Sequence, residues 1–296
     1  MIYSEISSNK RKTALLITFF LVLITGLGFV LARAYDAPGL LPLAVIISVG
    51  MSLVSYFYSD KIVLRMSKAK EIKRTDDPEL YRSVENLSIA AGLPTPKIYL
   101  IDDTAPNAFA TGRNPKNAVI AITTGLRQKL SKAELEGVMA HELSHIGNYD
   151  IRLSTIIVVL VGVVALLSDW MLRAHIFGGK RDRENNQIIM IVGIVLAILS
   201  PIAATLIQLA VSRKREYLAD ASAALLTRYP EGLAGALRKI SDDHEPLEVA
   251  NKATAHLYIV SPLKDHKKDG VGKFAGLFQT HPPIEERIQR LENMNK

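Results

Sequence analysis

The segment His141-Glu142-Leu143-Ser144-His145 carries two histidines four residues apart, with a glutamate directly after the first. Upstream, Ser131 followed by Glu134 forms a capping box that predicts the start of a helix through this segment. Residues four apart share one face of a helix, so both imidazoles can bind one ion. Zinc in a catalytic site takes three protein ligands and keeps one position open. The segment therefore predicts a zinc site in which Glu142 is the general base beside the open position.

The third ligand must come from elsewhere, and the chain has no cysteine, so it must be histidine, aspartate or glutamate. After the last long apolar stretch the chain reads Arg213-Lys214-Arg215-Glu216-Tyr217-Leu218-Ala219-Asp220. Spacing alone leaves Glu216 either the third ligand or a surface charge that follows three basic residues. Asp220, one helical turn on, is placed to bind the free nitrogen of a ligand histidine. The competing interpretation of the histidine pair is a helix surface with two solvated side chains.

Apolar residues are concentrated in four stretches. Hydrophobic residues make up 49% of the 296-residue chain and the mean hydropathy is +0.18, which favours a membrane protein. Residues 13–32 and 37–59 carry no charge, and each reaches the roughly 20 residues that cross a bilayer. Residues 153–168 form a shorter stretch, and 188–211 contain Pro201. The sequence predicts four membrane helices, with the second pair either spanning fully or forming a shallower hairpin.

Basic residues predict the orientation. Lys10, Arg11 and Lys12 precede the first stretch, and six Lys and Arg residues follow the second between positions 61 and 74. Both ends of this hairpin, and the polar region after it, therefore belong in the cytoplasm. A basic link between the third and fourth stretches opposes a full crossing there. The net charge of +7 is assigned to these topology signals and to anionic headgroups rather than to nucleic acid. A cleaved signal peptide is disfavoured because the first apolar run is too long.

The polar region after the first hairpin reads as a globular domain. Helical spacing predicts a helix over 76–91, and short apolar runs predict strands at 97–101 and 118–122, with 106–112 as a further candidate. A final helix is predicted over 283–295, and 241–280 reads as loop. Four histidines match no motif and are expected at the surface: His175, His244, His256 and His266.

Taken together, four motifs resemble the HtpX membrane peptidases, relatives of the CAAX prenyl endopeptidases. They are the segments 141–145, 216–220, Pro106-Asn107-Ala108-Phe109-Ala110-Thr111-Gly112 and His281-Pro282-Pro283. The resemblance implies a zinc endopeptidase of bacterial membranes that cleaves misfolded or damaged membrane proteins. It implies that His141, His145 and Glu216 bind one zinc ion and that Glu142 is the catalytic base. It places Asn107 on an edge strand beside the cleft and His281 near the reacting carbonyl.

The expected fold is a mainly α-helical membrane protein with four transmembrane helices and a cytoplasmic zincin-like catalytic domain that contains a small β-sheet. The expected divisions are a basic N-terminus (1–12), a first hairpin (13–59), a catalytic part with the histidine motif (60–152), a second hairpin (153–212) and a catalytic part with the third ligand (213–296). Expected partners are membrane-protein substrates and the bilayer of the inner cell membrane, with no nucleic acid. The alternatives are an intramembrane protease and a non-catalytic scaffold with structural zinc.

Overall fold

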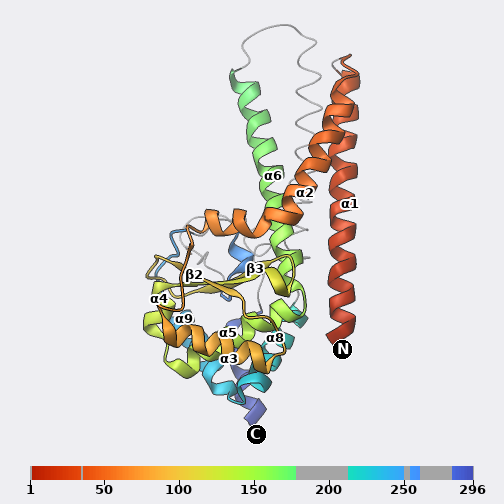
Figure 1. Cartoon of the computed structure of the whole chain (residues 1–296). Helices are drawn as coiled ribbons and strands as arrows, with labels where there is room; N and C mark the ends of the chain where they lie inside the picture. Colours follow the sequence, from red (N-terminus) through yellow and green to blue (C-terminus); the bar gives the residue numbers. More distant parts are fainter. Residues whose placement is uncertain (1, 35, 178–212, 250–253, 261–281, 296) are drawn as a thin grey trace.

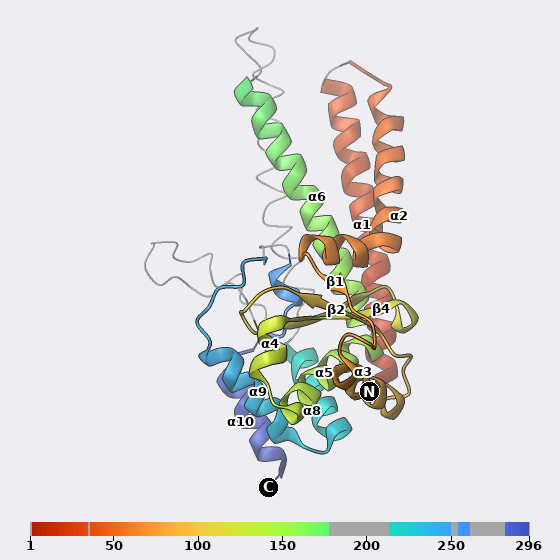
Figure 2. The same ribbon diagram turned by 60° about the vertical axis from the view of Figure 1, so that its left-hand side comes forward.

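The computed structural model describes residues 2–34, 36–177, 213–249, 254–260 and 282–295. Three long helices, α1 (Ile2–Ala34), α2 (Leu40–Met66) and α6 (Asp150–Phe177), project from a globular part that contains a small sheet and the remaining helices. Figures 1 and 2 show that the N-terminal end of α1 lies beside the globular part, whereas the link between α1 and α2 lies at the far end of the projecting helices.

Two of the described helices are long and apolar enough to cross a membrane, over 6–30 and 40–66. The first two predicted membrane helices are thereby confirmed as candidate spans. Large apolar side chains on both helices are more than half exposed, among them Val22 on α1 and Ile46 on α2. Such a surface suits lipid, in which an exposed apolar side chain carries no penalty. The mostly helical fold with apolar spans matches the predicted class.

The third predicted stretch belongs to α6, which begins at Asp150, earlier than position 153. Helix α6 follows α5 (Lys132–Gly147) at a bend of 81°. These two helices are long and apolar enough to cross a membrane only if they are taken together as one span. The bend occurs where Tyr149 has a positive φ of 61°. The fourth stretch, 188–211, lies outside the described residues, and so does the part of the basic link from 178 onward.

The sheet has four strands in the order β1 (Lys70–Glu71), β2 (Lys97–Ile101), β4 (Ala118–Thr123) and β3 (Ala108–Gly112). Strand β2 runs parallel to β4, whereas β1 and β3 run antiparallel to their neighbours. The three strands predicted from apolar runs are confirmed, including the candidate at 106–112. Strand β3 lies at the edge of this sheet.

Both faces of the central strands are covered, because successive side chains point to opposite faces. On β4, Ile120 and Ile122 face the core of the globular part, whereas Val119 and Ala121 face α2 and α6. Every residue of β4 is buried. The sheet thus separates the bases of the projecting helices from the layer of helices that carries the histidine motif, as Figures 1 and 2 show.

That layer contains α3 (Pro78–Ala90), α4 (Thr124–Lys129), α5, α8 (Arg213–Thr227), α9 (Pro230–Asp242) and α10 (Ile284–Glu292). Short 3₁₀ turns lie at Pro115–Asn117, Ala255–Leu257 and Asn293–Asn295. Helices α3 and α10 confirm the predicted helices at 76–91 and 283–295. Helix α9 packs closely on α5, since a Cβ added to Gly137 would lie 2.6 Å from the backbone nitrogen of Leu233.

The base of the membrane helices has its own core. Leu16, Phe20 and Ile24 on α1 pack against the first turns of α6, where Leu153 and Ile157 are buried. Because α6 continues directly from the bend after α5, this contact connects the first membrane helix to the helix that carries the histidine motif. The histidine motif therefore lies next to the bases of the membrane helices.

Candidate metal centre

Helix α5 presents His141, Glu142 and His145 on its inner side. The predicted capping box is present at its start, where the amide of Ser131 donates to Glu134 at 2.7 Å. The two histidines lie one turn apart, and their Nε2 atoms are 3.1 Å from each other. His141 is almost fully buried and His145 is slightly more open. The competing interpretation of two solvated histidines is therefore wrong.

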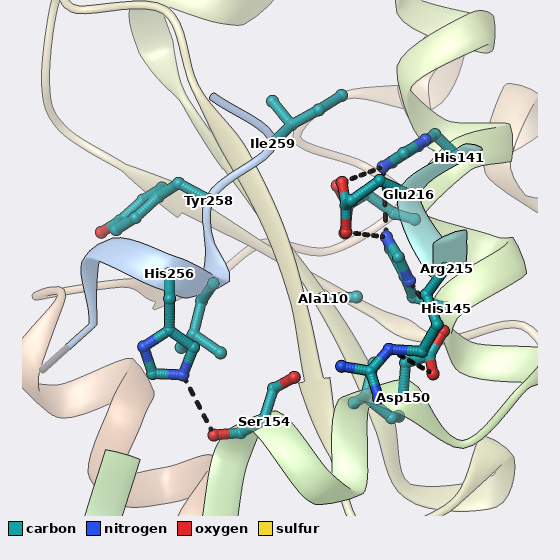
Figure 3. A pocket seen from close by; sticks show the side chains of 13 residues that line it. Ala110, His141, His145, Asp150, Ser154, Arg215, Glu216, His256, Tyr258 and Ile259 are labelled. Atoms are coloured by element: carbon teal, nitrogen blue, oxygen red, sulfur yellow. Dashed lines mark hydrogen bonds and ion pairs between the residues drawn. The ribbon is translucent and has the colours of Figure 1, made fainter. Parts of the chain in front are cut away.

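Helix α8 packs beside α5 and brings Glu216 to the same point. The carboxylate oxygens of Glu216 lie 3.8 Å from Nε2 of His141 and 3.6 Å from Nε2 of His145. One ligand atom from each of these three residues lies within 4.8 Å of the others. Glu216 is 6% exposed, so a surface charge is excluded. Figure 3 shows the three side chains converging from the two helices.

The outer nitrogens of both imidazoles face carboxylates. Nδ1 of His141 lies 2.9 Å from Asp220, as the predicted spacing required, and Nδ1 of His145 lies 3.0 Å from Asp150. The His145 contact is a hydrogen bond, whereas His141 meets Asp220 as an ion-pair contact. A carboxylate beside Nδ1 favours the proton there and leaves the lone pair of Nε2 free to bind an ion. Two such lone pairs 3.1 Å apart repel each other unless a cation lies between them. Two imidazole nitrogens and one carboxylate are also the ligands of many catalytic zinc sites, so these residues fit a metal ion.

The electrostatics also favour a cation. Burial disfavours the charged form of His145, but the hydrogen bond to Asp150 and the charge of Glu216 outweigh it and raise the pKa of His145 to about 9. Burial lowers the pKa of His141, which is fully enclosed. The carboxylates of Asp220, Asp150 and Glu216 lie against the two imidazoles. Negative charge at this position favours the binding of a cation.

Glu142 points into the same pocket from the next position on α5 and is 2% exposed. Burial raises the pKa of Glu142 to about 7, although the charge of His145 and a backbone hydrogen bond from Ala110 act in the opposite direction. A carboxylate with a pKa near neutrality can both accept and release a proton at physiological pH. Ala110 belongs to the edge strand β3, so Glu142 lies between the metal ligands and that strand.

Arg287 on α10 holds Asp220 and was missed from the sequence. It contacts both oxygens of Asp220, at 2.7 and 2.9 Å, and donates a third bond to the carbonyl of Ile259 at 2.9 Å. Burial would raise the pKa of Asp220, but the charge of Arg287 outweighs it and lowers that pKa to about 2. A signal existed, because Arg287 falls within the apolar stripe formed by Ile284, Ile288 and Leu291. A charged residue in such a stripe is buried and therefore needs a partner.

The segment 254–260 forms the opposite wall of the pocket. The amide of Ile259 donates to the carbonyl of Ala108, and Asn107 donates its side-chain amide to the carbonyl of Val260, each at 2.9 Å. Asn107 is buried and also accepts a bond from the amide of Ala108. Asn107 directly precedes the edge strand, which begins at Ala108, and its side chain is bonded to this wall.

His256 corrects one expectation. The sequence predicts a surface position, but His256 is 4% exposed, lines the pocket, and has Nε2 3.4 Å from the carbonyl of Ser154 (Figure 3). The reason is that the segment 254–260 folds back onto the edge strand, where Ile259 bonds Ala108. Such a long-range contact cannot be predicted from the local sequence pattern. His244 is exposed, as expected. His281 and His266 lie outside the described residues.

The model of Peptidase family M48 matches residues 74–295, which include all of the metal-binding candidates. The chain belongs to this family. The family implies a metal, and the three converging ligand residues are where this chain would hold it. The resemblance drawn from the four motifs is thereby confirmed at the level of the family.

Relatives extend this M48 assignment over the whole chain. A protease HtpX homolog of Tropheryma whipplei (strain Twist) is 47% identical over 99% of both chains, and one of Dictyoglomus thermophilum is 46% identical over 99% of this chain and 95% of that protein. The crystal structure of S. mikatae Ste24p is similar with a TM-score of 0.49 and 21% identity, covering 98% of this chain and 67% of that chain. With its apolar spans, this M48 chain is a membrane metalloprotease.

Proposed function

We propose that this M48 chain is a zinc endopeptidase of the bacterial cell membrane that cleaves misfolded or damaged membrane proteins at the cytoplasmic face. The observation that carries the proposal is the meeting of His141, His145 and Glu216 at one point, with Glu142 beside them. Three protein ligands leave one coordination position for the reaction, whereas a structural zinc is closed by four. This argues against a scaffold with structural zinc.

A bound zinc ion would polarise the scissile carbonyl and would lower the pKa of a bound water, so that the water loses a proton and attacks near neutral pH. Glu142 takes a proton from the attacking water as the new C–O bond forms, and then gives that proton to the amine nitrogen as the C–N bond breaks. Asp220 and Asp150 keep the two histidine rings oriented during this cycle. His281 is proposed to help hold the developing oxyanion.

The substrate is proposed to enter as an extended strand beside the part of β3 from Ala110 onward, because the carbonyl of Ala108 already accepts from the amide of Ile259. Ala110 lines the pocket from this edge strand, and Ile259 and Tyr258 line it from the opposite wall. Backbone pairing along a sheet edge binds a peptide without requiring a particular side chain, which suits an enzyme that degrades many damaged proteins. Asn107 would act by holding that wall in place through Val260.

The cytoplasmic orientation is supported by the arrangement of the helices. The N-terminal end of α1 lies beside the globular part, and Asn9 and Lys10 contact Asp150 and Tyr149 after α5, which supports placing Lys10 to Lys12 and the metal centre on the same side of a membrane. The positive-inside rule assigns that side to the cytoplasm. His145 is eight residues before the apolar stretch that begins at 153, and Glu216 is four residues after position 212. At about 1.5 Å per residue, these separations support a metal centre within roughly 10–15 Å of the membrane surface. An intramembrane protease is disfavoured because α5 packs in the core of the globular part.

The decisive experiment uses the variant Glu142→Gln in the full-length protein. It should retain one zinc ion per chain, measured by metal analysis, and lose at least about 100-fold in cleavage of a membrane-anchored substrate. Glu136→Gln is the matched control, since Glu136 lies on the same helix but bonds Ser83, away from the pocket. Cleavage that survives in Glu142→Gln would contradict the mechanism.

The proposed substrate class has its own test. The same unfolded reporter is offered to the wild-type enzyme either with or without a membrane anchor, in vesicles that contain the enzyme. The anchored form should be cut faster, because the site lies at the membrane surface. Equal rates for the two forms would contradict the restriction to membrane substrates without affecting the assignment of zinc and Glu142.

A further inference from the structure

A buried polar cluster connects the first membrane helix to the metal centre. Asn9, in the third turn of α1, is 1% exposed. Its side-chain amide donates to Asp150 Oδ1 at 2.6 Å and to the carbonyl of Asn148 at 3.0 Å. These contacts bridge 139 and 141 positions of sequence. Asn9 thus holds both the backbone and a side chain of the corner between α5 and α6.

Asp150 is the carboxylate that orients a metal ligand. Its other oxygen, Oδ2, lies 3.0 Å from Nδ1 of His145. Arg215, which directly precedes Glu216, completes the cluster with Nε 3.5 Å from Asp150 Oδ1 and Nη1 3.3 Å from the side-chain oxygen of Asn9. Each oxygen of Asp150 therefore has a defined partner, and one chain of contacts runs from α1 through Asp150 to His145.

The corner needs such a brace. Helix α6 leaves α5 at 81°, and Tyr149 between them adopts a positive φ of 61°. Asp150 is the first residue of α6, so the direction of its carboxylate depends on how this turn is held. Without the bonds from Asn9, the turn and the carboxylate lose two hydrogen bonds from α1, and a contact from α1 that remains is Lys10 over the ring of Tyr149, at 4.7 Å.

We propose that Asn9 is a positioning residue of the metal centre, which acts through Asp150 to fix the imidazole of His145. This inference rests on the proposed zinc function. It gives the start of α1 a role beyond the topology signal of Lys10 to Lys12, because the first membrane helix becomes part of what holds the metal.

The experiment measures zinc affinity of the full-length protein in detergent, by competition with a chromophoric chelator. Loss of a group that directly orients a metal ligand costs about 10–100-fold in affinity. Asn9 acts one contact further away, so Asn9→Leu should weaken zinc binding by about 3–10-fold. Thr13→Val is the matched control, since Thr13 is buried one turn further along α1 and its hydroxyl makes no hydrogen bond in the described structure. This control should bind zinc like the wild type.

A purely structural role for Asn9 predicts a different pattern. If Asn9 acts through Asp150, then Asn9→Leu should have no further effect on zinc affinity in an Asp150→Ala background, whereas independent effects would multiply. The thermal midpoint of the metal-free protein shows whether each variant is folded, and Asn9→Ala replaces Asn9→Leu if the latter is not. Wild-type zinc affinity in both Asn9 variants, or multiplying effects in the Asp150 background, would overturn the inference.

The two proposals fail in different ways. Suppose that Asn9→Leu weakens zinc binding as expected, but the wild-type enzyme cleaves no anchored substrate. This result would contradict the proposed function and leave the role of Asn9 intact. Cleavage by the wild type, together with unchanged zinc affinity in the Asn9 variants, would contradict the role of Asn9 and leave the proposed function intact.

Discussion

The two ligand histidines are one helical turn apart on α5, yet different parts of the molecule hold them. His141 is oriented by Asp220, which Arg287 on the C-terminal helix α10 contacts through both oxygens. His145 is oriented by Asp150 at the base of α6, next to Asn9 of α1. One ligand is thus supported from within the globular part and the other from the projecting helices α1 and α6. The metal centre joins the two parts, so its geometry depends on how they are packed together.

The supports also differ in strength. Asp220 and Arg287 form a two-pronged ion pair in which Arg287 is 1% exposed. Asp150 lies 3.5 Å from Arg215, a longer contact, and relies on a neutral amide for its shortest bond. A paired carboxylate and guanidinium form stronger bonds than a neutral donor does. We therefore expect the support from the globular part to contribute more to stability than the support from α1 and α6, although both orient the metal ligands.

The largest expected effect is that of Arg287→Leu. The substitution leaves the carboxylate of Asp220 buried without its cation, and breaking a buried pair in this way costs about 3–5 kcal/mol. The thermal or denaturant midpoint of the metal-free protein should fall accordingly. Replacing both partners, with Asp220→Leu added, should recover much of the stability while zinc binding stays weak. A midpoint unchanged by Arg287→Leu would show that the pair does not support the fold.

The next effect compares the two carboxylates directly. Asp220→Asn and Asp150→Asn should each weaken zinc binding by about 10–100-fold, because each removes the charge that orients one histidine. Asp220→Asn should in addition lower the midpoint of the metal-free protein more than Asp150→Asn does, since it removes the two-pronged partner of the buried Arg287 and leaves only the longer 3.9 Å contact with Glu216. Zinc titration and thermal unfolding of the same samples check both. Equal destabilisation by the two variants would contradict the asymmetry.

A smaller effect is expected at a contact between β3 and α6 that does not involve the metal ligands. The hydroxyls of Thr111 on β3 and Thr155 on α6 lie 2.9 Å apart, and both residues are fully buried. Thr155→Val leaves the hydroxyl of Thr111 without this partner and should cost about 1–3 kcal/mol in stability. Zinc affinity should stay at the wild-type value, since neither residue touches the histidines or their carboxylates. A large loss of zinc affinity would show that the coupling between the halves is diffuse rather than carried by Asn9 and Asp150.

Local patterns predicted the parts of this molecule that neighbours in sequence determine. The capping box at Ser131, the helical face with His141 and His145, and the buried strand at 118–122 depend on residues a few positions apart. Asp220 could be assigned to a histidine because spacing of four on a helix fixes its direction relative to Glu216. The family resemblance added the segment at Asn107.

The missed residues act across the fold. Asn9 meets Asp150 at a separation of 141 positions, and Arg287 meets Asp220 at a separation of 67. No periodicity relates such pairs, because only the packing of α1 on α6 and of α10 on α8 brings them together. His256 reached the pocket for the same reason. Arg287 alone left a local trace, as a charge within the apolar stripe of α10.

The smallest expected effect provides a reference for the comparison. Asp77 caps α3 by accepting from the amide of Leu80 and pairs with Arg127, far from the metal in sequence and in contacts. Burial raises the pKa of Asp77, but the bonds from Arg127 and Leu80 outweigh it and keep that pKa below its ordinary value of 3.8. A carboxylate with a lowered pKa stabilises the fold above its unfolded pKa, and this contribution is lost as the pH falls through the lowered value.

Arg127→Gln should therefore cost about 1 kcal/mol or less at neutral pH, as partly exposed ion pairs do. The difference from the wild type should shrink as the pH falls below about 3.8, where Asp77 takes up a proton in both proteins. Thermal midpoints of the metal-free proteins across this range measure it, and zinc affinity at neutral pH should not change. Weaker zinc binding in Arg127→Gln would mean that a loss of stability alone disturbs the metal centre. The effects of the Asp220 and Asp150 variants on zinc affinity would then have to be compared with the effect of Arg127→Gln.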